Sequence, residues 1–194
     1  MTFDQIIQNL RKKVYHPVYL LMGEPYFIDT ISDFIEMNVL DEAEKEFNQS
    51  ILYGQDVNAI TLINTAKRYP MMANYHVVIV KESQMMKDFD ELALYVERPL
   101  KSTLLVLCYK YKTIDKRRKL YKSVDKAGVI LETKPLYDSQ IPNWIISHLK
   151  EKGYEIHPQA SLLLAQNIGN DLSRIANELQ KLFLNIPPRS TINA

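Results

Sequence analysis

A glycine turn between an apolar run and a helical pattern is the first place in this sequence where residues could do chemistry. The segment runs from Leu21 through Gly23 to Asp29, and a strand, a glycine and a helix are what a phosphate-binding loop requires. That loop reads G-x-x-x-x-G-K-[ST], because glycine N–H groups wrap the phosphates, the lysine supplies charge and the hydroxyl holds magnesium. Here Ile28 replaces the second glycine and Asp29 replaces the lysine. The sequence therefore predicts no ATP hydrolysis at this turn.

Other catalytic or metal-binding constellations are missing from the sequence. The histidines form no i, i+4 pair and there is a single cysteine, so a zinc site of the usual kind is not predicted. Cys108 ends an apolar run, which favours a small buried hydrophobe over a reactive thiol. We expect no catalytic residue, no metal and no cofactor. The histidines are His16, His76, His148 and His157.

The composition is that of a globular protein. Of 194 residues, 46% are hydrophobic and 24% are charged, and the formal net charge is +1. These values exclude a disordered or collagen-like chain. No apolar run reaches the roughly 18 residues of a membrane-spanning helix, and the N-terminus lacks the apolar core of a signal peptide. The protein is expected to be soluble and cytoplasmic and not to bind a membrane.

Charge is segregated along this near-neutral chain. Residues 24–46 hold eight acidic side chains and one lysine, whereas residues 110–126 hold eight basic side chains and two aspartates. At helical spacing, Lys116, Lys119 and Lys122 fall on one face of the basic segment. Such a face fits contact with a phosphate backbone, and it fits a solvated helix surface about equally well. The pattern alone leaves both interpretations open.

The elements that must position these residues alternate between short apolar runs and longer helical patterns. The runs are nearly continuous and rich in β-branched and aromatic residues, which is typical of buried parallel strands. The predicted strands are residues 18–22, 50–53, 76–80, 103–109 and 129–131. The predicted helices cover residues 3–12, 28–39, 57–66, 92–96 and 120–127, the third with a stripe of Val57, Ile60, Ile63 and Ala66. With right-handed crossovers, this order predicts an α/β fold, a five-stranded parallel sheet with helices on both faces.

After Lys134 and Pro135 the pattern changes to helices alone. Three apolar stripes predict a small three-helix bundle. They are Ile141, Trp144, Ile145 and Leu149; then Leu162, Leu163 and Leu164; and last Leu172, Ile175, Leu179 and Leu182. The prolines at 187 and 188 cannot continue the last helix. We therefore expect an α/β domain over residues 1–135, a helical lid domain over 136–186 and a linker over 187–194.

Four motifs, in their order along the chain, resemble the delta subunit family of the bacterial DNA polymerase III clamp loader. The last, a glycine-capped helix with a patterned Asn-Glu-Leu, is the most specific, and the resemblance covers essentially the whole chain. The motifs are VYLLMGEPYFID at 18–29, AKRYPMMA at 66–73, DKRRKLYK at 115–122 and GNDLSRIANELQKL at 169–182.

This resemblance implies two AAA+ -like domains that have lost the phosphate loop, in agreement with Ile28 and Asp29. It also implies a role: binding and opening the sliding clamp (beta) for loading onto primed DNA, as one arm of a loader whose other subunits hydrolyse ATP. The implied partners in that loader are the gamma/tau and delta prime subunits. DNA is then a partner in the assembled loader. The chain would not be an enzyme by itself but a subunit of a DNA-directed DNA polymerase holoenzyme, a nucleotidyltransferase as a complex. The family's helical collar domain would lie beyond residue 194, so a fragment is expected.

The resemblance also assigns clamp binding to Met71 and Met72. Family members carry two adjacent apolar residues at the end of the helix before the third strand, more often a leucine and an aromatic. The alternative is that both methionines belong to the core. Lys116, Lys119 and Lys122 are the candidate DNA-contact residues. Two other functions stay open: an NTPase of the phosphate-loop type, which lacks its lysine, and a standalone nucleic-acid-binding protein, which rests on the basic segment.

Overall fold

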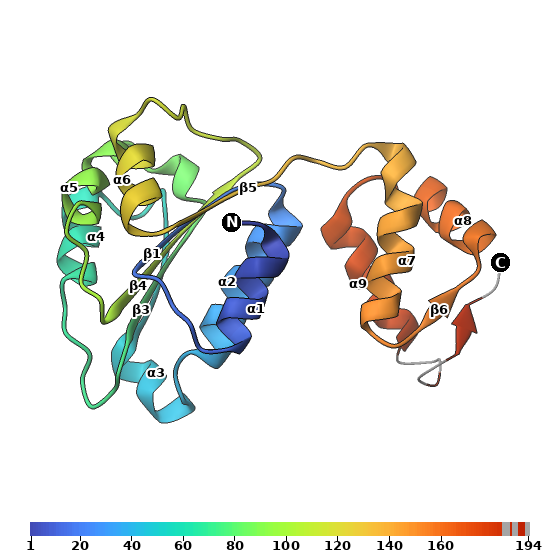
Figure 1. Cartoon of the computed structure of the whole chain (residues 1–194), viewed down its shortest axis with the longest axis horizontal. Helices are drawn as coiled ribbons and strands as arrows, with labels where there is room; N and C mark the ends of the chain where they lie inside the picture. The colour runs from blue at the N-terminus through green and yellow to red at the C-terminus, as the bar shows by residue number, and fades with distance from the viewer. Residues whose placement is uncertain (184–186, 188–189, 193–194) are drawn as a thin grey trace. The chain divides into compact units, whose positions relative to one another are not determined.

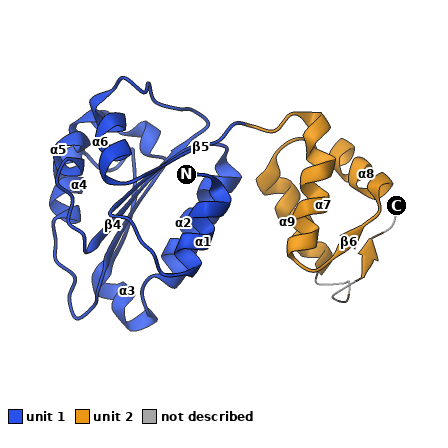
Figure 2. Cartoon of the chain, in the orientation of Figure 1, with its two compact units in different colours: residues 1–134 blue, residues 135–194 orange. Residues whose placement is uncertain are grey.

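The structure is a computed structural model that describes residues 1–183, 187 and 190–192. The chain forms two compact units, Met1–Lys134 (unit 1) and Pro135–Ala194 (unit 2), which Figure 2 shows in different colours. The elements of unit 1 are α1 (Phe3–Arg11), β1 (Val18–Gly23), α2 (Pro25–Asn38), α3 (Glu42–Asn48), β2 (Gln49–Tyr53), α4 (Ala59–Ala66), β3 (His76–Lys81), the 3-10 helices η1 (Ser83–Met85) and η2 (Phe89–Leu92), α5 (Ala93–Val96), β4 (Thr103–Lys110), α6 (Lys119–Ala127) and β5 (Val129–Glu132). Those of unit 2 are η3 (Asp138–Gln140), α7 (Ile141–Glu151), β6 (Glu155–Ile156), α8 (Pro158–Ile168), α9 (Leu172–Phe183) and β7 (Thr191–Ile192).

Unit 1 is built on a five-stranded sheet in the order β2-β3-β4-β1-β5, and every pair in it is parallel. Every residue of β1 is buried, as expected for a strand covered on both faces. In the register, Gly23 at the end of β1 lies opposite Lys110 at the end of β4. The predicted α/β class and all five predicted strands are confirmed.

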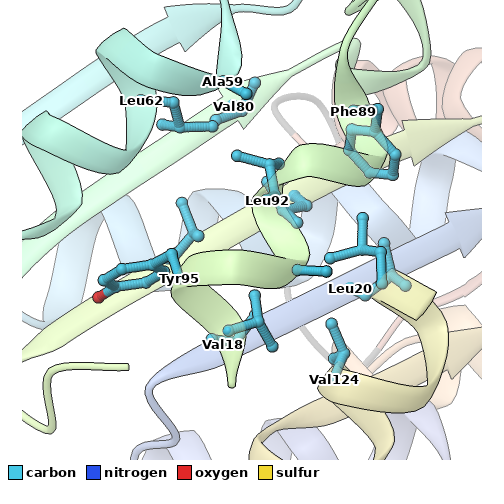
Figure 3. Close-up of a cluster of buried hydrophobic side chains, with 14 of the residues drawn as sticks. Val18, Leu20, Ala59, Leu62, Val80, Phe89, Leu92, Tyr95 and Val124 are labelled. Atoms are coloured by element: carbon cyan, nitrogen blue, oxygen red, sulfur yellow. The ribbon is translucent and has the colours of Figure 1, made fainter. Parts of the chain in front are cut away.

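Helices cover the two faces of the sheet and form two separate cores. Helices α1 and α2 lie on one face, and α4, α5 and α6 lie on the other (Figure 1). Because side chains alternate across a strand, Tyr19 and Leu21 of β1 enter the first core and Val18 and Leu20 enter the second. Figure 3 shows the second core, in which these two residues lie among side chains of the covering helices, including Val124 of α6.

Helix α4 buries most of the predicted stripe. Ala66 has no exposed surface, and Val57 and Ile63 are partly buried and pack against the core, but Ile60 is exposed, so the prediction was wrong at that position. Ala59 and Leu62, which the predicted stripe did not include, are fully buried. The Ala59 N–H donates to Asp88 Oδ2 at 2.8 Å and holds the start of the helix together with the local Asn58 cap.

Unit 2 contains the three predicted helices, packed through buried residues of α7 and α9 such as Ile145 and Ile175. The Asp171 carboxylate accepts a hydrogen bond from the Arg174 N–H at 3.0 Å and caps α9, which is the usual role of a short acidic side chain at that position. Leu162 and Leu163 of α8 are exposed, so their predicted stripe is not buried within the described part of unit 2.

Unit 2 also contains a parallel strand pair, so the description as helices alone was incomplete. Strand β6 pairs with β7, with Ile156 opposite Ile192. The His157 N–H donates to the Ile192 carbonyl at 2.8 Å, which holds part of the predicted linker in a strand. The remainder of the 187–194 prediction falls partly on residues 188–189 and 193–194, which lie outside the described residues. No helix in the described part of the chain is long and apolar enough to cross a membrane.

Candidate functional site

The parallel sheet has two edges of different character. All five strands end at one edge, here called the carboxyl edge, where a phosphate-loop protein binds its ligand. The segments that lead into the strands lie at the opposite edge, here called the amino edge. The glycine turn lies at the carboxyl edge. The segment that contains Met71 and Met72 leads into β3 and lies at the amino edge.

The glycine turn at the carboxyl edge is closed by Thr133. The Glu24 N–H, which would face a phosphate in a working loop, donates to Thr133 Oγ1 at 2.9 Å. The Thr133 hydroxyl and N–H both donate to the Met22 carbonyl, at 3.0 and 2.9 Å. The carbonyl of Gly23 accepts from the Tyr111 N–H at 2.7 Å. The polar backbone groups of this turn therefore have partners within the protein.

Ion pairs fill the same edge. The carboxylate of Asp29, at the position of the missing lysine, accepts a hydrogen bond from Lys110 Nζ at 2.8 Å and forms an ion pair with it. At the end of β3, Lys81 Nζ lies 3.2 Å from Glu36 of α2. Burial lowers the pKa of Lys81, but the hydrogen bond and charge of Glu36 outweigh it and raise this pKa above its ordinary value. These charged groups at the carboxyl edge therefore form ion pairs with one another, which a nucleotide and its metal would have to break.

We expect this chain not to bind Mg-ATP with micromolar affinity. The loop lysine is an aspartate, and the N–H and cationic groups nearby already bond to Thr133, Asp29 and Glu36. Isothermal calorimetry with Mg-ATP checks this expectation. A dissociation constant in the micromolar range would overturn it and restore the NTPase interpretation.

The amino edge carries an exposed apolar loop. Residues 67–75, here called the methionine loop, connect α4 to β3, and within it Met71 is 62% exposed and Met72 is fully exposed. The alternative that both methionines belong to the core is therefore wrong. They do not end the helix either, because α4 stops at Ala66 and Met71 lies in the loop. The end of the loop that leads into β3 is held, since Ala73 and Tyr75 pack against the core under α1 and α2.

Helix α3, which was not among the predicted helices, supports this loop. Its last residue, Asn48, is 1% exposed, and its side chain bonds to both backbone polar groups of Met71. A local signal for the helix exists, because Asp41 and Glu44 form a capping box. No local signal exists for the contact. It arises because β2 and β3 are adjacent and parallel, which brings the segments before them together.

The basic segment differs from the predicted helix face. Helix α6 begins only at Lys119, so Lys116 lies in the turn before it. The turn forms because the Asp115 carboxylate accepts from the N–H and guanidinium of Arg117, as an aspartate two residues upstream often does. Lys119 and Lys122 do lie on the helix and all three lysines are exposed.

Two of these three lysines are paired with carboxylates. Lys116 Nζ lies 2.8 Å from Glu132, and Lys119 Nζ lies 2.9 Å from Glu97. Lys122 takes part in none of the ion pairs within the described residues. The positive field of the segment is therefore weaker than its composition suggests, and of the three candidate lysines Lys122 is the one without a carboxylate partner among the described ion pairs.

Replacing Lys116, Lys119 and Lys122 together with alanine is expected to leave the fold intact, because exposed ion pairs contribute only about 0–1 kcal/mol each. If these lysines contact DNA in an assembled loader, the dependence of log affinity on log salt falls by about 0.9 for each neutralised phosphate. Salt titrations of loader–DNA binding measure this, with Lys12→Ala as the control. An unchanged salt slope would support the solvated-surface alternative.

These features define the class of the protein: an α/β domain of the phosphate-loop type with its phosphate position closed from within, followed by a small helical unit. Its residues 19–134 match the DNA polymerase III, delta subunit family, and the chain belongs to that family. It is 29% identical over 203 residues to the DNA polymerase III subunit delta of Bacillus subtilis (strain 168), covering 99% of this chain and 58% of that protein.

A solved structure of a clamp loader delta protein is also similar to this chain. The Bacillus subtilis DNA clamp loader delta protein (YqeN) superimposes with a TM-score of 0.79 at 27% sequence identity, over 98% of this chain and 60% of that one. The chain thus spans about three fifths of the length of the relatives that it matches.

Proposed function

We propose that this chain binds the sliding clamp of its replication machinery and helps to open it, as the delta component of a clamp loader. Membership of the DNA polymerase III delta subunit family supports the replication role. The observation that carries the contact itself is the exposed Met71–Met72 pair, held at the amino edge of the sheet. Adjacent exposed apolar side chains are typical of a protein-binding surface.

The methionine pair suits an apolar pocket on a protein partner. Methionine is unbranched and polarizable, so it adapts to an irregular pocket. The loop presents Met72 with its whole side chain outside the protein, which leaves it available for burial on binding. Each fully buried methionine side chain is worth about 1.5–3 kcal/mol. Such a pair can act as the anchor of an interface whose remaining contacts are weaker.

The chain works without ATP hydrolysis of its own in this proposal. The closed turn at Gly23 and the Asp29–Lys110 pair support this. ATP hydrolysis then belongs to other subunits of a loader in which gamma/tau and delta prime are the partners. The chain is in this view a cytoplasmic component of the polymerase complex and not its catalyst. DNA contact through Lys122 belongs to the assembled loader, because a few phosphate contacts give only weak binding.

A binding assay of this chain against its cognate sliding clamp, by surface plasmon resonance, tests the proposal directly. Saturable binding at a one-to-one ratio with a clamp protomer is expected. Failure to bind the clamp, together with salt-sensitive binding to DNA by the isolated chain, would favour the standalone nucleic-acid-binding function instead.

A further inference from the structure

Asn48 joins two segments that are far apart in the sequence. Its Oδ1 accepts from the Met71 N–H at 2.6 Å, and its Nδ2 donates to the Met71 carbonyl at 2.9 Å. The same Nδ2 donates to the Glu44 carbonyl at 3.0 Å, one turn back in α3. The side chain is buried, so these bonds are shielded from water. One amide group therefore fixes the peptide groups on both sides of Met71 to the end of a helix.

The backbone held in this way has a conformation that the loop would not keep by itself. Met72 has φ = 53°, in the left-handed region that costs a residue with a Cβ about 1–2 kcal/mol. A conformation of this kind persists only where its surroundings hold it. The bonds from Asn48 act on the residue immediately before Met72, and α3 and the methionine loop lie at the same end of unit 1 (Figure 1).

We propose that Asn48 is a positioning residue: it holds the methionine loop in the conformation that presents Met71 and Met72 to the clamp. This inference rests on the proposed function. Because the loop is already ordered in the free chain, binding carries no entropy cost for ordering it. The affinity for the clamp is correspondingly higher. Asn48 itself is buried and acts only through the backbone of Met71.

The alternative is that Asn48 only stabilises the end of its own helix. Asn38 provides the matched control, because it also ends a helix and its Nδ2 donates to the carbonyl four residues back, at 2.8 Å from Phe34. Asn38 shares that local bond and has no bond to the methionine loop among the described residues. Because Asn38 is exposed and Asn48 is buried, the two alanine variants are compared at the Met71 amide, which bonds to Asn48 alone, and not by their overall stability.

Hydrogen–deuterium exchange on the free chain tests the positioning without any partner. In Asn48→Ala, the amide of Met71 should exchange at least about tenfold faster than in the parent, while the amides of β3 stay unchanged. Asn38→Ala should leave the Met71 amide unaffected. If Asn48→Ala does not fold, Asn48→Leu fills a similar volume and removes all three bonds, including the one from the Met71 N–H, and it is compared with Asn38→Leu. An unchanged Met71 amide in the Asn48 variant overturns the proposal.

Clamp affinity in two backgrounds tests whether the positioning matters for binding. Asn48→Ala should weaken clamp binding about tenfold in the parent chain. This change in affinity corresponds to the free energy of about one hydrogen bond. In a Met71→Ala/Met72→Ala background it should weaken binding less than about twofold, because the side chains it positions are gone. Equal losses in both backgrounds overturn the proposal. Binding that survives the double methionine variant unchanged overturns the proposed clamp contact instead, and leaves the exchange result intact.

Discussion

Replacing Met71 and Met72 together with alanine is expected to weaken binding to the cognate sliding clamp at least about thirtyfold. Both side chains are exposed in the free chain, so their burial in a partner's pocket is gained only on binding. Truncation of a central interface residue costs about 2 kcal/mol or more. The same exposure predicts that the variant keeps the stability of the parent, because no core contact is lost.

A matched control separates this contact from a general loss of surface apolarity. Met37 on α2 and Met85 in η1 are also exposed, and a Met37→Ala/Met85→Ala variant removes the same atoms from elsewhere. Surface plasmon resonance of both variants against the clamp, with thermal unfolding of each, gives the comparison. A clamp affinity within about threefold of the parent for Met71→Ala/Met72→Ala would reject the assignment.

Replacing Gly23 with alanine is expected to destabilise unit 1 by on the order of 3–5 kcal/mol. Gly23 has φ = 105°, and a Cβ there would overlap the carbonyl oxygen of Thr133. Because that oxygen belongs to the backbone next to β5, it cannot rotate away as a side chain would. The substitution must therefore move the turn that Thr133 closes, together with its bonds to Glu24 and Met22.

Gly153→Ala is the control for the backbone conformation alone. Gly153 also has a positive φ, 81°, but no described atom lies within 4 Å of the position that a Cβ would take, so we expect a loss of about 1 kcal/mol. The two units can be followed separately, since Trp144, the one tryptophan of the chain, lies in unit 2. Urea unfolding should show a large shift for Gly23→Ala in the tyrosine near-ultraviolet dichroism, to which unit 1 contributes most, and a small shift for Gly153→Ala in the fluorescence of Trp144 in unit 2. Equal shifts for both variants would contradict the overlap.

Together these two predictions describe a sheet whose edges have separate roles. At the carboxyl edge, Thr133 and the Asp29–Lys110 pair use the groups that a nucleotide would need. At the amino edge, the methionine loop directs apolar side chains away from the protein. A change at the first edge should therefore alter stability, and a change at the second should alter partner binding.

Much of the fold could be predicted from the local sequence. The strands were predictable because a strand buried on both faces is apolar at nearly every position, as β1 is. The absence of the phosphate-loop lysine, whose position Asp29 occupies, can be read from a single residue, and it predicts that the phosphate-loop chemistry is missing. The sequence also showed two adjacent methionines at 71 and 72, but it left open whether they belong to the core, and their exposure is a result of the structure.

Helix faces and charges needed the tertiary structure. For α4 the predicted stripe included Ile60, which is exposed, and left out Leu62, which is buried, because the spacing of apolar residues does not show which side of the helix meets the sheet. For the basic segment the sequence supplied the number of positive charges, but Glu132 and Glu97 come from other elements and neutralise two of them. Helical spacing also predicted that Lys116 lies on the same helix as Lys119. In the structure Lys116 lies in the turn formed by Asp115, which precedes α6.

The sequence by itself determined the fold class, the absence of the phosphate-loop motif and the adjacency of two methionines, because each depends on residue type and spacing along the chain. Only the tertiary structure decided which side chains and backbone groups bond to one another at the two edges of the sheet. The bonds of Asn48 to Met71 span 23 positions, those of Lys110 to Asp29 span 81, and those of Thr133 to Met22 span 111. Such contacts follow from the order β2-β3-β4-β1-β5, and strand order is a property of the packed sheet that no local pattern contains.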